Sequence, residues 1–236
     1  MLMTINTKSA IILAAGFGKR MRHLTNEVPK PLINFKGKPL IQYSIDFLEL
    51  LEVQEIIINV HYKSEQIKEF VKNLGNSKIK ISDESSEILD TGGGVKKAMS
   101  LINATESIVV NSDILWNEKQ INSLKEMDSM FDRNFCDSLL CLSPIENTKG
   151  YNGEGDFAFL DDNKICRYQS TDKYPFVYCG AQIISKNAFV NFAEDVFSIN
   201  KIWNRSISND RLMGFKNNSE IFHIGSVETL DRFDEK

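Results

Sequence analysis

The sequence predicts an α/β fold whose sheet is doubly wound and mostly parallel, with an antiparallel extension toward the C-terminus. Up to Asn111, short apolar runs rich in isoleucine alternate with helix-length segments, which is typical of a parallel sheet with helices on both faces. A glycine turn follows the first of these runs directly. Beyond Trp116 the pattern changes to one helix and then several strand-like runs separated by turn residues.

The first half of the chain is predicted to alternate strand and helix. Pro39 suits the first turn of the first helix, because proline lacks the N–H that a helix start leaves unpaired. In a doubly wound sheet, ligands bind beyond the carboxyl ends of the strands, and Gly16, Gly18 and Asp113 all fall at such ends. The predicted strands cover residues 10–15, 55–60, 78–82 and 107–111, and the predicted helices cover residues 39–52, 64–73 and 93–101.

The glycine turn is typical of a phosphate site. Residues 10–21 read AIILAAGFGKRM, so a buried strand runs into a turn whose backbone amides can bind phosphate. The third glycine of a dinucleotide fingerprint is missing, and no Gly-Lys-Ser/Thr of a Walker loop follows. Arg20 and Lys30 are the candidate cations, because phosphoryl transfer needs fixed positive charge at the leaving pyrophosphate. Lys30 lies between two prolines that restrict its backbone, whereas Lys19 is interpreted as a solvated neighbour.

The second half is predicted to form an antiparallel extension over the first, where a second substrate would lie. A helix over residues 117–130 is followed by strands over 138–142, 156–160 and 176–184. We find no linker, low-complexity tract or internal repeat. We therefore predict one domain over residues 1–236, with a nucleotide-binding half over about 8–115 and a second half over about 116–225.

Composition gives no indication of a nucleic-acid or membrane partner. The formal charge is −4, from 28 basic and 32 acidic residues that are mixed along the chain. No secretion signal or membrane-spanning run is evident, so we expect a cytoplasmic protein. The four cysteines form no Cys-x-x-Cys pair, which favours reduced thiols. The sequence gives no indication of the oligomeric state.

The opening motif, taken with Arg20 and the segment PKPL at residues 29–32, resembles the signature of the sugar-phosphate nucleotidyltransferases. The resemblance spans nearly the whole chain and is strongest over residues 10–40 and 89–113. It is greatest to the N-acetylmuramate 1-phosphate uridylyltransferases. It implies a Rossmann-like fold and an EC 2.7.7 type reaction with Mg²⁺ as cofactor. In this reaction a nucleoside triphosphate and a sugar 1-phosphate give a nucleotide sugar and pyrophosphate. UTP and N-acetylmuramate 1-phosphate are the favoured substrates.

The resemblance also implies roles for individual residues. Arg20, Lys30 and Asp113 would be catalytic. An aspartate at a strand end is often only a turn or cap residue, but the Asp of the family's Asn-x-Asp binds the metal, and Asp113 matches it. The segments GEGDF (153–157) and Tyr178-Cys179-Gly180 resemble family segments that would contact the sugar phosphate. The alternatives are that the first is an ordinary turn and that Gly180 is an ordinary strand glycine. The nucleotide-binding assignments are Leu13, Ala14, Ala15, Gly16, Gly18, Gly92 and Gly93, and the sugar-phosphate assignments are Gly155, Asp156 and Gly180.

The cluster DTGGG at residues 90–94 has two interpretations from the residues alone. Three successive glycines suit close approach of a nucleobase edge to the backbone, or a flexible loop before a helix. The family's Glu-Thr-Gly-Gly-Gly at this place favours the nucleobase.

His223 is the main departure from the family pattern. The C-terminal HIGSVE resembles the family's ending, in which the first residue is normally an Asp that acts as a second magnesium ligand. Imidazole is a poor ligand for Mg²⁺. His223 is therefore a possible metal neighbour, a phosphate contact or a structural residue.

Two alternative functions stay open at this point. One is a related transferase: a mannose- or heptose-1-phosphate guanylyltransferase, or a phosphocholine cytidylyltransferase. The other is a non-catalytic nucleotide-sugar sensor, which the His223 departure suggests and the intact Arg20, Lys30 and Asp113 disfavour.

Overall fold

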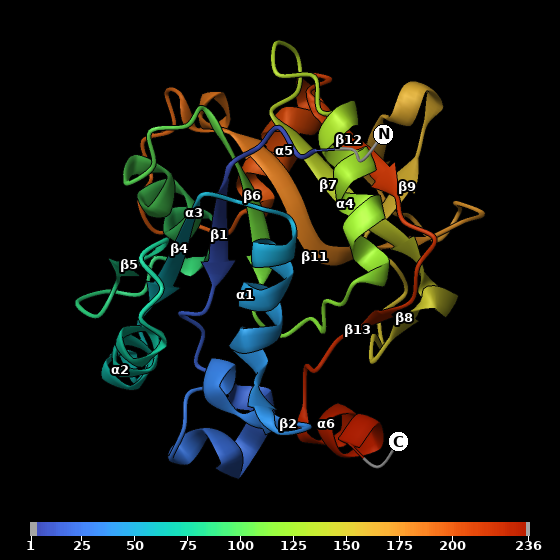
Figure 1. Ribbon diagram of the computed structural model, residues 1–236. Helices are drawn as coiled ribbons and strands as arrows, with labels where there is room; N and C mark the ends of the chain where they lie inside the picture. The colour runs from blue at the N-terminus through green and yellow to red at the C-terminus, as the bar shows by residue number, and fades with distance from the viewer. Residues whose placement is uncertain (1–3, 235–236) are drawn as a thin grey trace.

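The first predicted strand forms the centre of the sheet. In the computed structural model, which describes residues 4–234, β1 (Ser9–Leu13) pairs in parallel with β4 (Glu55–Val60) and β6 (Glu106–Asn111), one on each side (Figure 1). β5 (Ile79–Asp83) pairs in parallel with β4. Alternate residues of β1 face opposite cores, so both sides of the strand are buried. This parallel half confirms the predicted fold class.

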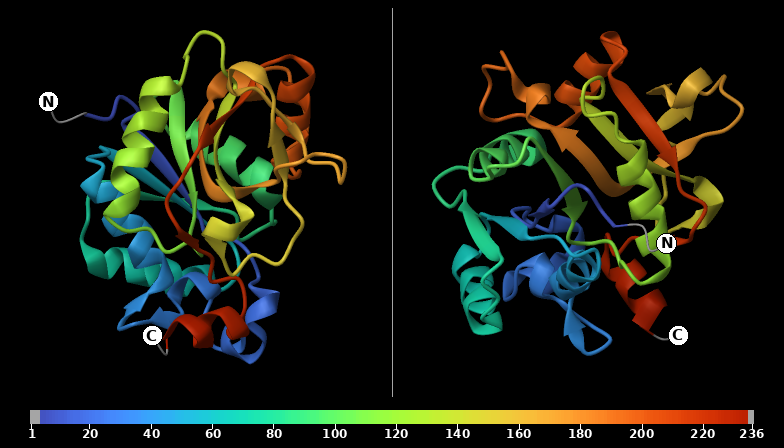
Figure 2. Two further views of the ribbon diagram at one scale, coloured as in Figure 1. Left: turned by 90° about the vertical axis from the view of Figure 1, so that its right-hand side faces the viewer. Right: turned by 45° about the horizontal axis from the view of Figure 1, so that its top comes forward.

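Helices cover both faces of the sheet (Figure 2). Apolar residues of α1 (Leu40–Leu50), α2 (Ser64–Leu74) and α4 (Lys119–Met130) pack into the core on one face. Those of α3 (Asp90–Ser100) and α5 (Asn200–Ser208) pack into the core on the other. The chain runs from β1 outward to β4 and β5 and then returns to β6 on the opposite side of β1. This reversal places a crevice at the carboxyl ends of β1 and β6.

The antiparallel extension continues the same sheet, and the prediction that it lies over the nucleotide half was wrong. β11 (Phe176–Ser185) pairs antiparallel with β6 and with β7 (Ser138–Pro144). β12 (Leu212–Lys216), which was not predicted, pairs in parallel with β7. The sheet has nine strands, which include β9 (Phe157–Phe159) and β10 (Ile165–Arg167). Seven of them follow the order β10-β9-β11-β6-β1-β4-β5, and β7 and β12 branch off at β11.

The C-terminal segment returns to the nucleotide half. β13 (Ile221–Phe222) pairs in parallel with β8 (Thr148–Lys149), and the amide of Ile224 donates to the carbonyl of Asp113. The segment ends in α6 (Val227–Asp234), which packs near the 3-10 helix η1 (Lys19–Asn26). A second short 3-10 helix, η2 (Lys30–Leu32), and the ribbon of β2 (Asn34–Phe35) and β3 (Lys38–Pro39) complete this end of the molecule.

Most predicted boundaries move by one or two residues, and two of the shifts concern the crevice. The first strand ends at Leu13 instead of residue 15, so Ala14 and Ala15 belong to the turn. α3 begins at Asp90 instead of Gly93. Asp90 and Thr91 are exposed, whereas Gly92 and Gly93 are buried and their amides donate to the carbonyl of Phe197.

None of the described helices is long and apolar enough to cross a membrane. The four cysteines are unpaired, and Cys166 is the one that is partly exposed.

Candidate active site

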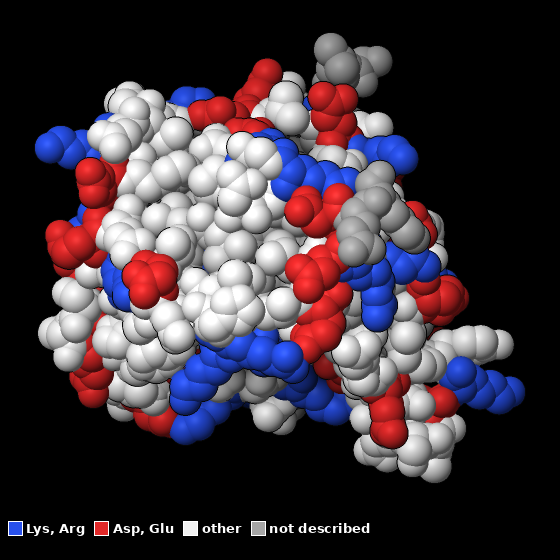
Figure 3. Space-filling model, turned by 90° about the horizontal axis from the view of Figure 1, so that it is seen from below, with Lys and Arg blue, Asp and Glu red and all other residues white. Residues whose placement is uncertain are grey.

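A cavity of about 410 Å³ opens at the carboxyl ends of β1 and β6. Seen from below, the surface there is hollowed and largely uncharged, with Lys and Arg side chains along one side (Figure 3). The lining includes eight predicted site residues: Leu13, Ala14, Ala15, Gly16, Gly18, Arg20, Lys30 and Asp113. It also includes residues that were not predicted to form the site: Lys19, Pro31, Asn59, Glu84, Ile88, Asp90, Thr91, Asn111, Ser112 and Gly225.

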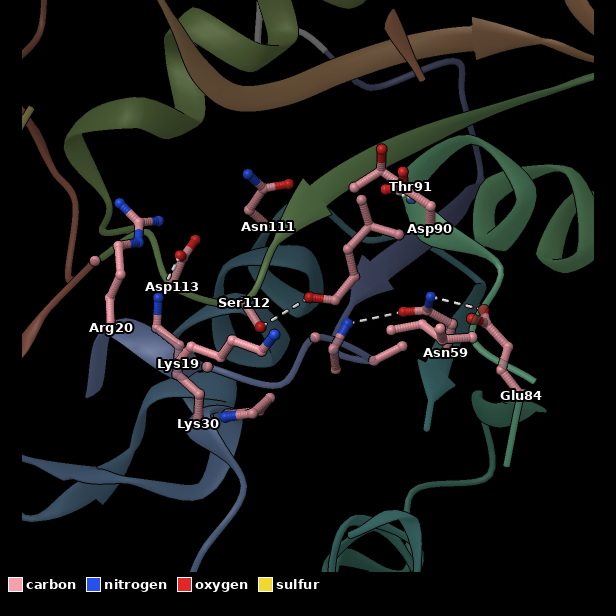
Figure 4. A pocket seen from close by; sticks show the side chains of 18 residues that line it. Lys19, Arg20, Lys30, Asn59, Glu84, Asp90, Thr91, Asn111, Ser112 and Asp113 are labelled. Carbon is pink, nitrogen blue, oxygen red and sulfur yellow. Dashed lines mark hydrogen bonds and ion pairs between the residues drawn. The ribbon is translucent and has the colours of Figure 1, made fainter. Parts of the chain in front are cut away.

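One side of the cavity is cationic. Lys19, Arg20 and Lys30 all lie there (Figure 4). Lys19 is exposed, as expected of a solvated neighbour, but it also lines the cavity. The glycines of the turn make room in different ways. A Cβ on Gly16 would meet no protein atom within 4 Å, whereas Gly18 has φ +64° and a Cβ there would lie 2.8 Å from Cβ of Lys30. Gly16 therefore leaves its backbone open to the cavity, and Gly18 allows the close turn toward Lys30.

Asp113 is held by two partners on one oxygen. The Lys30 ammonium lies 2.6 Å from Oδ2, and Nε2 of His223 donates to the same oxygen at 3.1 Å. Burial alone would raise the pKa of Asp113, but the charge of Lys30 and the hydrogen bond from His223 hold it well below its usual range. The carboxylate is therefore charged, and the histidine faces the site.

The opposite side of the cavity carries hydrogen-bonding groups (Figure 4). Asn59 Oδ1 accepts from the amide of Ala14 at 2.8 Å, and its Nδ2 donates to Glu84 at 2.8 Å. This chain of contacts ties the glycine turn to the carboxylate. Burial raises the pKa of Glu84, and the hydrogen bond from Asn59 lowers it in part. Asp90 and Thr91 at the start of α3 complete this side.

A polar side chain at the buried end of an isoleucine-rich strand was the signal that could have identified Asn59. Asn59 ends the run Ile56-Ile57-Ile58 and is 3% exposed. Buried amides need partners, so such a residue indicates a polar network at that strand end. Glu84 carries no such signal, because it follows a strand whose residues alternate in polarity.

Gly92 and Gly93 do not line the cavity, although we assigned them to the nucleotide. A Cβ on Gly92 would collide with the ring of Phe197, and one on Gly93 would overlap the carbonyl oxygen of Asp195. A Cβ on Gly94 would lie 2.7 Å from Nδ2 of Asn59. Packing of α3 against residues 195–197 and against Asn59 accounts for all three glycines.

The predicted sugar-phosphate residues lie in the antiparallel extension and outside the cavity lining. Asp156 accepts from the Tyr151 hydroxyl at 3.2 Å and from the amide of Tyr178 at 2.9 Å. Gly155 has φ +121°, and its amide donates to the Tyr151 hydroxyl. Gly180 has φ +73° at an irregularity of β11, where a Cβ would meet Ile114 and Asn111. These contacts fix the loop and strand, and Gly180 lets β11 approach the strand end at Asn111.

A second cavity, of about 340 Å³, adjoins the first on its cationic side. The two share Lys19, Arg20 and Gly225. Arg22, Asn152 and the start of α6 line the rest, and Arg22 is paired with Glu228 at 2.5 Å. The cations at residues 19 and 20 therefore face both spaces.

Asp113 is the carboxylate on the cationic side of the cavity that could hold a metal ion. No cluster of three or more His, Cys, Asp or Glu side chains suited to a metal occurs among residues 4–234. Oδ1 of Asp113 has no hydrogen-bond partner in the described part of the chain, while Oδ2 is occupied by Lys30 and His223. A single free oxygen beside three cations suits an ion whose other ligands are phosphate oxygens and water.

Comparisons with known proteins agree with this geometry. Residues 9–151 match the family model described as Nucleotidyl transferase. The N-acetylmuramate alpha-1-phosphate uridylyltransferase of Caulobacter vibrioides is 31% identical over 227 residues, which are 94% of this chain and 93% of the relative. The chain belongs to the nucleotidyl transferase family. The resemblance seen in the sequence and the expectation of an enzyme of this class are confirmed.

Other relatives of this nucleotidyl transferase differ in the base that their names specify. The uridylyltransferase of Neisseria meningitidis that acts on N-acetylmuramate alpha-1-phosphate is 28% identical over 92% of this chain and 93% of its own. The D-glycero-alpha-D-manno-heptose 1-phosphate guanylyltransferase of Campylobacter jejuni is 29% identical over 78% of this chain and 79% of its own. The structure of HddC from Yersinia pseudotuberculosis with GMP-PN is 25% identical, with a TM-score of 0.77 over 97% of this chain and 99% of that one.

Proposed function

We propose that this protein transfers the uridylyl group of UTP to N-acetylmuramate 1-phosphate, forming a UDP-sugar and releasing pyrophosphate. The observation that carries the proposal is the two-sided cavity at the ends of β1 and β6, cationic on one side and hydrogen-bonding on the other. A nucleoside triphosphate has the matching polarity. The two uridylyltransferase relatives, aligned over more than nine tenths of this chain, support the choice of base and sugar.

In this proposal the chain binds and orients, and the reacting atoms belong to the substrates. The amides of the glycine turn, with Lys19 and Arg20, bind the β- and γ-phosphates. A phosphate oxygen of the sugar 1-phosphate attacks the α-phosphorus, a new P–O bond forms, and the bond to the bridging oxygen of pyrophosphate breaks. Lys30 neutralises charge that builds around the α-phosphorus. Holding the two substrates in line lowers the entropic cost of their encounter.

No protein nucleophile is required. Among the lining residues that the structure describes there is no Cys or His, and the two hydroxyl side chains already have partners. Ser112 Oγ donates to the carbonyl of Leu13 at 2.8 Å, and Thr91 Oγ1 accepts from the amide of Ile199 at 3.0 Å. The cavity therefore favours direct displacement over a covalent intermediate.

Magnesium is part of the proposal, with Asp113 as its protein ligand through Oδ1. The ion would supply positive charge to the phosphates when bound. His223 and Lys30 fix the carboxylate through its other oxygen. Because Asp113 offers the ion one free oxygen, we expect the ion to bind together with the nucleotide.

A guanylyltransferase is the second candidate, because two acidic side chains, Glu84 and Asp90, line the hydrogen-bonding side. Carboxylates accept hydrogen bonds. Guanine carries an exocyclic amino group that can donate to them, whereas uracil carries no amino group. The Campylobacter and Yersinia relatives give this candidate its support.

Pyrophosphate release tests both candidates. The purified protein is incubated with UTP, GTP, CTP or dTTP, each with N-acetylmuramate, mannose, glucose or heptose 1-phosphate, with and without Mg²⁺. We expect turnover that needs a triphosphate, a sugar 1-phosphate and the divalent cation, with UTP and N-acetylmuramate 1-phosphate giving the highest kcat/KM. A preference for GTP would favour the second candidate. Turnover that excess chelator does not diminish would contradict the metal, and no turnover with any pair would favour a sensor.

A further inference from the structure

Phe17 is the residue between the two glycines of the turn, and its side chain packs against two aromatic rings. Its ring lies 5.6 Å from that of His61, edge to face, and 5.6 Å from that of Tyr62, both in the connection from β4 to α2. Phe17 is not a lining residue and is 40% exposed. An exposed phenylalanine in a phosphate-binding turn serves no contact with phosphate, so its aromatic neighbours account for it.

Tyr62 contacts both ends of the segment that carries the cations. Its ring meets Phe17 at the start, and its hydroxyl donates to the carbonyl of Thr25 at 2.8 Å near the end. Lys19 and Arg20 lie between these two contacts. The Lys19 ammonium is also 5.5 Å from the centre of the Phe17 ring, within the range of a cation–π interaction.

The segment has little internal support of its own. η1 is a 3-10 helix without a side-chain cap at its start, and it is interrupted at Arg22, where φ is 51° and ψ is −125°. Short 3-10 turns have poor hydrogen-bond geometry. Burial of Met21 anchors the middle of the segment. Contacts from outside are still needed to fix the part that precedes Met21, where Lys19 and Arg20 lie.

We infer that Phe17 and Tyr62 form a brace that positions Lys19 and Arg20 for the β- and γ-phosphates of the nucleoside triphosphate. The inference rests on the proposed function. Phe17 and Tyr62 are positioning residues, since neither touches the cavity. Because Asn59, Glu84 and Thr91 are held by other contacts, loss of the brace affects binding of the triphosphate tail and spares binding of the base and ribose.

The experiment compares a triphosphate with a monophosphate. Calorimetry measures the affinity for the α,β-methylene analogues of UTP and GTP, and for UMP and GMP, with wild type, Phe17→Ala and Tyr62→Ala. We expect each variant to weaken binding of the triphosphate analogue about tenfold or more, as loss of oriented charge-assisted contacts does, and to leave the monophosphate affinity within about twofold.

Two further variants keep the test decisive if an alanine variant fails to fold. Tyr62→Phe keeps the ring and loses the hydrogen bond to Thr25, so it should weaken the triphosphate analogue less than Tyr62→Ala but still selectively. Phe135→Ala is the matched control, because Phe135 is 42% exposed and lies outside the cavity lining. It should leave both affinities unchanged. His61 is not used, because its Nδ1 also contacts the backbone carbonyl of Glu84 at 2.7 Å.

Equal weakening of triphosphate and monophosphate would show a general structural role and overturn the brace. Unchanged affinities in folded Phe17→Ala, or in both Tyr62 variants, would overturn it too. If wild type binds none of the four nucleotides, the proposed function fails and the brace fails with it. Binding by wild type that the variants do not alter defeats the brace alone.

Discussion

The Lys30 ammonium lies 2.6 Å from Oδ2 of Asp113, although 83 positions separate the two residues in the sequence. His223, a further 110 positions along, donates to the same oxygen. Three distant segments of the chain thus meet at one carboxylate beside the cavity. The arrangement keeps Asp113 charged and fixes the direction of Lys30, which is what a group that neutralises developing charge needs.

We expect Lys30→Ala to lower kcat/KM about 100-fold or more, since a positioned charge at a developing negative centre has this effect. Removing one partner of a largely buried pair should also lower the free energy of unfolding by about 3 kcal/mol. Adding Asp113→Asn to Lys30→Ala should restore part of the stability and none of the turnover. Lys72→Ala, on the exposed face of α2, is the control. Near-normal turnover in folded Lys30→Ala would show that the phosphates bind elsewhere.

The glycines of the two clusters should respond differently to alanine. Gly16→Ala should change the free energy of unfolding by no more than about 0.5 kcal/mol, because its Cβ meets no protein atom. It should nevertheless weaken triphosphate binding about tenfold or more by blocking the approach of phosphate to the amides. Gly93→Ala should lower the free energy of unfolding by about 2 kcal/mol or more, because its Cβ overlaps Asp195. Urea unfolding and calorimetry separate the two effects, and a fully stable Gly93→Ala would contradict the packing argument.

The contrast between Gly16 and Gly93 also shows where prediction from sequence succeeded. The isoleucine-rich strands and the turn at Gly16 depend on residues close together in the chain, so local pattern identified them. The reason for Gly93 depends on residues 195–197, which tertiary folding alone brings to α3. No local pattern indicates that partner.

The same limit applies to the site itself. The resemblance selected Lys30 and Asp113 separately. It did not indicate that Lys30 and His223 both contact Oδ2 of Asp113, because this depends on where η2 and the C-terminal segment pack. β12 was missed for a related reason: its five residues include Gly214, and they form a strand because β7 offers an unpaired edge.

Glu84→Gln should change how stability depends on pH. Burial raises the pKa of Glu84 in the folded state above its value in the unfolded chain, near 4.3. Its favourable contribution is therefore complete below that value and is lost as the pH rises through the folded-state pKa. We expect the stability of Glu84→Gln relative to wild type to increase from pH 4 to pH 7, in urea unfolding at each pH. Glu87→Gln, also in the β5–α3 connection, serves as the control. A difference that is constant with pH would contradict the raised pKa.

His223→Asp should create a stronger metal site. The imidazole donates to Oδ2 of Asp113, so an aspartate at this position would bring a second carboxylate toward the same ion, and carboxylate oxygens are the ligands that Mg²⁺ prefers. We expect the Mg²⁺ concentration for half-maximal turnover to fall about tenfold. Mn²⁺ should also raise the Tm of this variant without nucleotide, while the wild type, with its single carboxylate, should respond only when nucleotide is present.

His223→Gln, which keeps a donor, should behave as wild type, and His223→Ala should lose affinity for the ion because Asp113 is less firmly held. Superimposable Mg²⁺ and Mn²⁺ titrations for wild type, His223→Asp and His223→Ala would show that position 223 does not act on the metal. The hydrogen bond from His223 to Asp113 would then be a purely structural contact.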